Sequence, residues 1–277
     1  MQQDARGSLH FPARRLTAQG VEVLDEIVAE EVAVALVYNG ISHAVMMATP
    51  CDLEDFARGF TLTERIVEKP SEIYDIEVQE DERAPQPGSR GRGIEVRLEI
   101  ANQRMAALQQ QRRTLAGRTG CGLCGVDSLD AALRPVALAS GAGKVTRAAI
   151  TRAMQALPAE QKINKQNGAT HAAGWATPDG TLVAVREDVG RHNALDKLAG
   201  ALAKAGAGQD GGFVVVTSRC SYEMVQKAAA IGAAAIASVS APTSLAIATA
   251  EQAGIGLAAF VRDNRLTVYA HAERIEA

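Results

Sequence analysis

The chain has 277 residues, of which 47% are apolar and 22% charged, and its formal charge at pH 7 is −3. A chain of this length can bury a sizeable core and form one large or two modest domains. The small net charge gives no reason to expect nucleic acid or an anionic membrane as a partner. Four cysteines are too few for a disulfide-stapled scaffold. We therefore expect a cytoplasmic protein with reduced thiols.

No segment has the pattern of a signal peptide or a membrane span. The first 16 residues lack the continuous apolar stretch of a signal peptide. Residues 228–250 carry no charge over about the length of a membrane-spanning helix. They are mostly Ala, Gly, Ser and Thr and contain Pro242, a composition that partitions weakly into lipid. Two buried helices separated by a strand explain this segment better.

The N-terminal half predicts a mixed α+β lobe over residues 26–116, preceded by a flexible arm over residues 1–25. The dipeptide Asn39-Gly40 lies between two apolar runs and so predicts a β-hairpin. A helix, two alternating strands and a second helix are expected to follow. These elements span residues 52–66, 73–80, 93–100 and 102–117.

Residues 146–277 predict an α/β lobe, because strands alternate with helices there and some of the strands should therefore pair in parallel. Thr146 is expected to cap a helix that runs through Leu157. Strand-like and helix-like segments then alternate to a final pair of strands at 256–261 and 266–271. Residues 117–145 are expected to form a glycine-rich loop and connector between the two lobes.

The sequence "GRTGCGLCGV" places Cys121 and Cys124 among four glycines. A structural zinc site needs four ligands, but the other two cysteines stand alone and no histidines show H-x-x-x-H spacing. A thioredoxin-like pair needs a rigid corner between a strand and a helix, which four glycines do not favour. A redox or zinc-binding adaptor is therefore a less favoured alternative, beside two packing thiols, a cofactor-binding chaperone that does not use the pair, and a carrier of persulfide sulfur.

A glycine-flanked loop suits a sulfur carrier, because one sulfur atom must reach both a donor and an acceptor. No acidic residue occurs between Glu99 and Asp127, whereas four arginines do: Arg104, Arg112, Arg113 and Arg118. Nearby cations favour the nucleophilic thiolate and attract an anionic acceptor. Cys121 is the nearer cysteine to Arg118 and is the expected nucleophile, while Cys124 assists, resolves or carries sulfur in turn.

A second candidate site is the polar tip between the last two strands, Phe260, Val261, Arg262, Asp263, Asn264 and Arg265. The two arginines have the charge to hold phosphates, and Asp263 and Asn264 have the groups to recognise a base edge. A solvated turn would have the same sequence pattern.

Four further features have less specific patterns. Arg219 and Ser221 begin a helix, which fits either a phosphate site or an ordinary cap. His192 and Asp196 share a helix face at i, i+4, most simply as a surface pair. His171 in a strand is expected to be a core histidine. The two isolated cysteines, Cys51 and Cys220, are expected to be packing thiols.

Several segments, taken in order, resemble one family over residue 25 to the C-terminus. They are "EEVAVALVYNGISHAVMMATP", "LAGRTGCGLCGV", "EDVGRHNALDKL", "SRCSYEMVQKAA" and "VYAHAERI". The chain is similar in these segments to the formate dehydrogenase accessory sulfurtransferases, the FdhD family. This resemblance implies sulfur transfer from an IscS-type cysteine desulfurase to the molybdenum bis(molybdopterin guanine dinucleotide) cofactor, before that cofactor enters the formate dehydrogenase catalytic subunit.

The resemblance also implies roles for particular residues. Cys121 would carry the persulfide, and Phe260–Arg265 would bind the cofactor, whose nucleotide end a guanine nucleotide would mimic. It further implies a homodimer and a cytidine deaminase-like, three-layer α/β fold for the C-terminal lobe. The sequence has no P-C-x-x-C and therefore lacks the complete H-x-E and P-C-x-x-C signature of the zinc deaminases, so neither deamination nor a metal of its own is expected.

Overall fold

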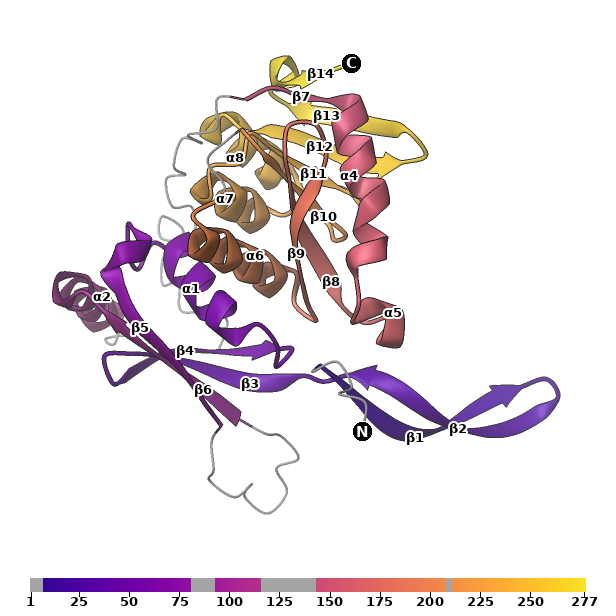
Figure 1. Cartoon of the computed structure of the whole chain (residues 1–277), viewed down its shortest axis with the longest axis horizontal. Helices are drawn as coiled ribbons and strands as arrows, with labels where there is room; N and C mark the ends of the chain where they lie inside the picture. The colour runs from indigo at the N-terminus through magenta and orange to yellow at the C-terminus, as the bar shows by residue number, and fades with distance from the viewer. Residues whose placement is uncertain (1–6, 81–92, 116–142, 208–210) are drawn as a thin grey trace.

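The computed structural model describes residues 7–80, 93–115, 143–207 and 211–277. The described residues form a four-stranded and a six-stranded sheet, which pack in separate hydrophobic cores, and two smaller two-stranded sheets, one of them a projecting hairpin (Figure 1). Among the described residues no helix is long and apolar enough to cross a membrane.

The N-terminal lobe is a four-stranded sheet covered on one face by helix α1 (Leu53–Thr63). The strand order is β4-β3-β6-β5, and β3 pairs with β6 in parallel. Its strands are β3 (Val32–Tyr38), β4 (Ile41–Ala48), β5 (Ile73–Glu80) and β6 (Gly93–Ile100). Helix α2 (Asn102–Leu115) follows β6, and its Met105 and Leu108 belong to the same core. The predicted hairpin at Asn39-Gly40 is confirmed, since both residues have the positive φ of a type I′ turn.

The C-terminal lobe is a six-stranded sheet in the order β13-β12-β11-β10-β8-β9. Its strands are β8 (His171–Ala176), β9 (Leu182–Asp188), β10 (Phe213–Val216), β11 (Ala235–Ser238), β12 (Gly256–Arg262) and β13 (Arg265–Ala270). Strands β10, β11 and β12 are parallel, and the pairs at both edges are antiparallel.

Helices cover both faces of this sheet (Figure 1). One face packs on α6 (Arg191–Ala205), α7 (Tyr222–Ala230) and α8 (Ser244–Ala253), and the other on α4 (Arg147–Glu160). The predicted three-layer α/β arrangement is therefore confirmed. Thr146 caps α4 as expected, its hydroxyl accepting from the Ala149 N–H. Short elements complete the chain: β7 (Val145–Thr146), α5 (Asn164–Asn167), β14 (Ile275–Glu276) and two 3-10 turns at Pro70–Glu72 and Ala272–Arg274.

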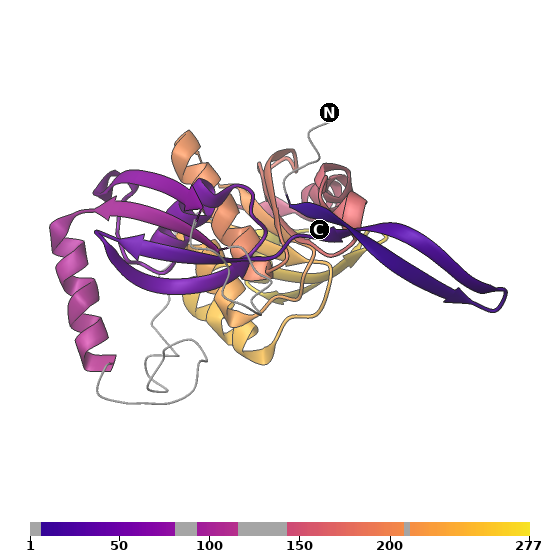
Figure 2. The same ribbon diagram turned by 90° about the horizontal axis from the view of Figure 1, so that it is seen from below.

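The arm predicted over residues 1–25 is ordered into a hairpin from residue 8 onward, so the prediction of a flexible arm is wrong there. Strands β1 (Ser8–Thr17) and β2 (Gly20–Ala29) pair along their whole length and project from the body of the molecule (Figure 2). Cross-strand ion pairs such as Arg15–Glu26 support the pairing. Several apolar side chains on the hairpin are exposed, among them Leu16 at 76% and Val23 at 74%.

Helices α1 and α6 hold the two lobes together and touch backbone to backbone. A Cβ atom on Gly59 would lie 1.7 Å from the carbonyl oxygen of Asp196, and one on Gly200 would lie 1.9 Å from that of Asp55. No larger residue fits either position unless the helices separate. The two glycines therefore fix how the lobes pack.

Buried ion pairs surround this crossing. The Lys227 ammonium lies 2.9 Å from Asp196 and 2.8 Å from Glu64. Burial lowers the pKa of Lys227, but the carboxylates of Asp196 and Glu64 oppose it and hold that pKa above its ordinary value. Lys197 and Asp188 form a second pair at 2.7 Å, and both side chains are fully buried.

We expect Gly59→Ala to lower the free energy of unfolding by about 1–3 kcal/mol, because the new methyl group overpacks the helix crossing. Urea unfolding measures the change. Glu54→Ala on the exposed side of the same helix is the control, with an expected change within about 0.5 kcal/mol. Equal effects of the two substitutions would contradict the close-crossing interpretation.

Lys227→Met should lower the free energy of unfolding by about 3–5 kcal/mol, because it leaves Asp196 buried without its ammonium partner. The double variant Lys227→Met/Asp196→Leu should recover much of this loss, since it removes both buried charges. If the double variant is no more stable than the single one in the same urea titration, the pair does not act as described.

Candidate functional site at the carboxyl edge of the central sheet

Cys121 and Cys124 lie outside the described residues, so the structure leaves the prediction for the C-x-x-C pair untested. Of the four arginines expected to favour its thiolate, Arg104 is the one whose side chain is described. Arg104 lies 2.6 Å from Glu68 and 2.9 Å from Glu72. Its charge is therefore shared with two carboxylates of the N-terminal lobe, which weakens the contribution expected of it.

The Phe260–Arg265 tip belongs to a larger polar edge of the six-stranded sheet of the C-terminal lobe, called the central sheet below. Strands β10, β11 and β12 are parallel, and β9 runs in the same direction because it is separated from β10 only by the antiparallel β8. Their carboxyl ends and the N-termini of α6, α7 and α8 therefore lie along one edge (Figure 1). This is the edge where open α/β sheets bind ligands.

Hydrogen bonds join the loops along this edge from the tip to α6. Arg262 Nε donates to the Val239 carbonyl at 3.2 Å, and Phe260 N–H donates to Ser240 at 3.4 Å. The next two loops are joined by backbone bonds between Cys220 and residues 241 and 243. Ser221 then faces His192 at the start of α6. The edge is thus one connected surface.

The tip itself is a tight turn with a bulge beside it. Asp263 and Asn264 both have positive φ, as a two-residue type I′ turn requires. The side-chain oxygen of Asn264 accepts from Gln155 at 3.2 Å, and its carbonyl accepts from Arg147 at 3.1 Å. In this conformation Asn264 is bonded to α4, so its side-chain oxygen is already engaged.

The other four tip residues differ in what they can offer a ligand. Phe260 has a φ of 53° and is 43% exposed, beside a register shift in β12. Val261 is buried in the core at 4% exposure, so it can offer only backbone groups. The Arg265 guanidinium and the Asp263 carboxylate are exposed and 4.0 Å apart, whereas Arg262 bonds to the neighbouring loop.

The predicted surface pair of His192 and Asp196 is wrong. Asp196 turns into the crossing of α1 and α6 and binds Lys227. His192 instead lies 2.8 Å from Glu223 and 3.4 Å from the Ser221 hydroxyl, both at the start of α7. The hydrogen bond from His192 lowers the pKa of Glu223. The i, i+4 spacing correctly places both residues on one face of α6. It does not show that this face packs against α1 and α7, where each residue finds a different partner.

Four further residues that the sequence analysis named lie near this edge or in the core behind it. Cys220 is fully buried, and burial raises the pKa of its thiol to about 12, which confirms a packing thiol. His171 is half-buried at the start of β8, and burial together with Arg191 lowers its pKa. Ser221 precedes α7 without a side-chain capping bond, so the ordinary-cap interpretation is wrong for its hydroxyl. Arg219 is exposed.

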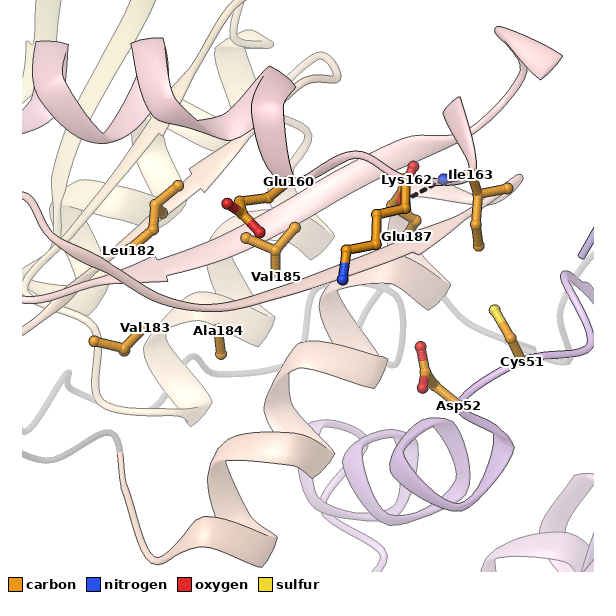
Figure 3. Close-up of a pocket in the computed structure, with 10 residues that line it drawn as sticks. All are labelled: Cys51, Asp52, Glu160, Lys162, Ile163, Leu182, Val183, Ala184, Val185 and Glu187. Atoms are coloured by element: carbon orange, nitrogen blue, oxygen red, sulfur yellow. Dashed lines mark hydrogen bonds between the residues drawn. The ribbon is translucent and has the colours of Figure 1, made fainter. Parts of the chain in front are cut away.

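Sequence reasoning missed a pocket of about 440 Å³ between the two lobes (Figure 3). It lies between β9, the end of α4 and the turn before α1, with Lys162 and Asp52 on opposite sides. Cys51 lies at its margin, 3.7 Å from Lys197 Nζ. Burial raises the pKa of the Cys51 thiol although Lys197 opposes this. No group of three or more His, Cys, Asp or Glu close enough to hold a metal occurs in the described ranges.

Comparisons with known proteins agree with this architecture. Residues 29–276 match the model of the FdhD/NarQ family. The chain is 56% identical over 250 residues to the sulfur carrier protein FdhD of Cupriavidus necator, covering 90% of this chain and 83% of the relative. It is 49% identical to the protein of that name from Bordetella petrii, covering 92% of this chain and 89% of the relative.

A solved structure has the same fold. It is the crystal structure of a Desulfotalea psychrophila protein provisionally assigned as a formate dehydrogenase accessory protein. It superposes with a TM-score of 0.72 at 26% identity, over 97% of this chain and 99% of that chain. The family match over nearly the whole chain and the close relatives lead to one conclusion: the chain belongs to the FdhD/NarQ family.

Proposed function

We propose that this protein is a sulfurtransferase that carries sulfur for the maturation of formate dehydrogenase. The observation that carries this proposal is the C-x-x-C pair in a chain 56% identical to a protein named a sulfur carrier. The architecture supports it, because the sheet edge that includes the 260–265 tip is a surface on which an acceptor can be held.

Cys121 is the proposed carrier. Its thiolate attacks the terminal sulfur of a persulfide on the donor, a cysteine desulfurase. The S–S bond of the donor breaks, the donor cysteine leaves as a thiolate, and a new S–S bond forms on Cys121. No external oxidant is needed. Cys124 then assists release of the sulfur or carries it in turn.

The proposed acceptor is the molybdenum bis(molybdopterin guanine dinucleotide) cofactor, bound at Phe260–Arg265. The tip can offer a ring at Phe260 and backbone groups at Val261, Asp263 and Asn264, with Arg265 exposed for an anionic group. The cofactor is cargo in this scheme, and the formate dehydrogenase catalytic subunit receives it.

A homodimer is also part of the proposal. An isolated two-stranded hairpin is marginally stable in water, yet β1 and β2 project from the body with apolar side chains such as Leu16 and Val23 exposed. A partner protein that stays bound would cover these apolar side chains. We propose a second copy of the chain as that partner, because it is present wherever the protein is made.

Peptide mass spectrometry after incubation with cysteine and a cysteine desulfurase tests the carrier role. The peptide containing Cys121 should gain one sulfur atom, which reductant removes, and Cys121→Ala should abolish the gain. Cys51→Ala, at a half-buried thiol elsewhere in the chain, is the matched control and should leave the gain unchanged. Absence of added sulfur on both Cys121 and Cys124 would instead favour a chaperone that binds the cofactor without carrying sulfur.

GDP mimics the nucleotide end of the cofactor, so its binding tests whether the 260–265 tip holds the cofactor. Replacing Asp263 and Asn264 together by Asn-Gly keeps the type I′ turn, so binding through backbone groups should stay within about threefold of the wild type. Phe260→Ala should weaken GDP binding about tenfold, since stacking on an aromatic ring contributes about 1–3 kcal/mol. Isothermal titration calorimetry measures both. Unchanged binding in Phe260→Ala would remove the ring from the site.

A further inference from the structure

The proposed function does not use the pocket of about 440 Å³ between the two lobes (Figure 3). Its volume is within the range of small-molecule sites. One wall is apolar and is formed by β9 and by a residue shortly after α4, namely Leu182, Val183, Ala184, Val185 and Ile163. A ligand with an apolar body would pack on this wall, and its polar groups would then meet the charged residues that line the rest of the pocket.

Charged groups of both signs line the pocket and are free to bind a ligand. The Lys162 ammonium and the Glu160 carboxylate make no ion pair or side-chain hydrogen bond with another described residue. Asp52 lines the opposite side (Figure 3). It lies 3.7 Å from Arg186, whose shorter contact of 2.7 Å is with Asp55. The pocket therefore offers one cation and two weakly engaged carboxylates.

The backbone at Asp52 keeps its carboxylate out of the helix that it begins. Asp52 is the N-cap of α1, a position where an aspartate usually accepts a hydrogen bond from the first turn. Here its φ is 52°, in the left-handed region, and its side chain makes no capping bond. The carboxylate points instead toward the side of the pocket on which Lys162 lies (Figure 3).

Strand β9 adds a backbone donor. It is an edge strand, so one of its sides has no neighbouring strand. Ala172 on β8 bonds through its backbone to Thr217, away from β9. Since Ala172 lies opposite Glu187 in the register, Glu187 and Val185 turn their backbone groups to the open side. The Val185 carbonyl accepts from Arg186, whereas the Val185 N–H has no partner among the described residues.

We propose that this pocket binds a zwitterion of the amino-acid class, either a free amino acid or a short peptide. Lys162 and the Val185 N–H hold its carboxylate, Asp52 and Glu160 hold its ammonium group, and the β9 wall covers its apolar side chain. A lone anion would meet two carboxylates, and a lone cation would meet the Lys162 ammonium, so the ligand needs both charges. Because Asp52 belongs to the N-terminal lobe and Lys162 to the C-terminal lobe, a bound ligand also bridges the lobes.

Titration calorimetry with the dipeptide leucyl-leucine tests this site in the full chain. The wild type should bind the dipeptide, and Lys162→Gln and Asp52→Asn should each weaken binding about tenfold, because each removes a charge-assisted contact. Asn keeps the size of Asp and also tolerates a left-handed backbone. Lys165→Gln is the matched control, since Lys165 is an exposed lysine that does not line the pocket, and it should bind as the wild type does.

Blocking the ends of the ligand gives a second test. N-acetyl-leucyl-leucine amide has the same side chains without the two charges, so it should bind at least about tenfold more weakly than leucyl-leucine. The Val185 amide resonance should shift when leucyl-leucine binds, and the melting temperature should rise with its concentration. Tighter binding of leucyl-leucine than of leucine assigns the site to peptides, and the reverse order assigns it to free amino acids.

The outcomes separate this inference from the proposed function. No binding of leucyl-leucine or leucine by the wild type, equal affinity for the blocked peptide, or unchanged affinity in both variants overturns the zwitterion site. Lys162 and Asp52 are exposed, and urea unfolding should show that both variants are folded. Sulfur uptake by Cys121 should be unchanged in Lys162→Gln, so the carrier role and this site fail or hold in different measurements.

Discussion

The backbone contact between α1 and α6 is the constraint on which the rest of the structure depends. Gly59 and Gly200 each lie against a carbonyl group of the other helix, so neither position accepts a side chain. This close approach places Thr63 and Glu64 of the N-terminal lobe within reach of Lys227 on α7. It also brings Thr49 to the buried pair of Lys197 and Asp188. Charges that are costly to bury are thereby paired across the lobe boundary.

The same packing fixes α6, and α6 in turn carries both structural and potential binding groups. Its inward residues Asp196 and Lys197 hold the lobes together. Its first turn, with Arg191 and His192, lies at the carboxyl edge of the central sheet. One helix therefore links lobe packing to the edge that carries the 260–265 tip. A change that shifts α6 should disturb stability and ligand binding together.

Local patterns in the sequence predicted most of the elements, because hairpin, capping and periodicity signals act over a few residues. Asn39-Gly40 and the Thr146 cap are examples. The β1–β2 hairpin was missed, because Pro12 interrupts the first apolar run and the turn residues Ala18-Gln19 carry no Asn-Gly signal. The role of Asp196 was missed because it depends on Lys227, which is 31 residues away and on another helix.

Only those parts of the candidate site that lie in short sequence motifs could be predicted. The C-x-x-C pair and the arginine-flanked tip could be recognised from their residues. That Val261 is buried, and that Asn264 is bonded to α4, depends on how β12 packs against its neighbours. The meeting of Arg191, His192 and Ser221 depends on the order of strands in the sheet, which no local pattern contains.

Delivery of sulfur to the cofactor is the central claim, and a chase of labelled sulfur tests it most directly. The chain would be loaded with radioactive sulfur from labelled cysteine, freed of donor, and mixed with the molybdenum bis(molybdopterin guanine dinucleotide) cofactor. We predict that the label leaves the protein and appears in the cofactor fraction, and that Phe260→Ala slows this transfer. Label that stays on the protein, while the treated cofactor still activates formate dehydrogenase, would contradict the account.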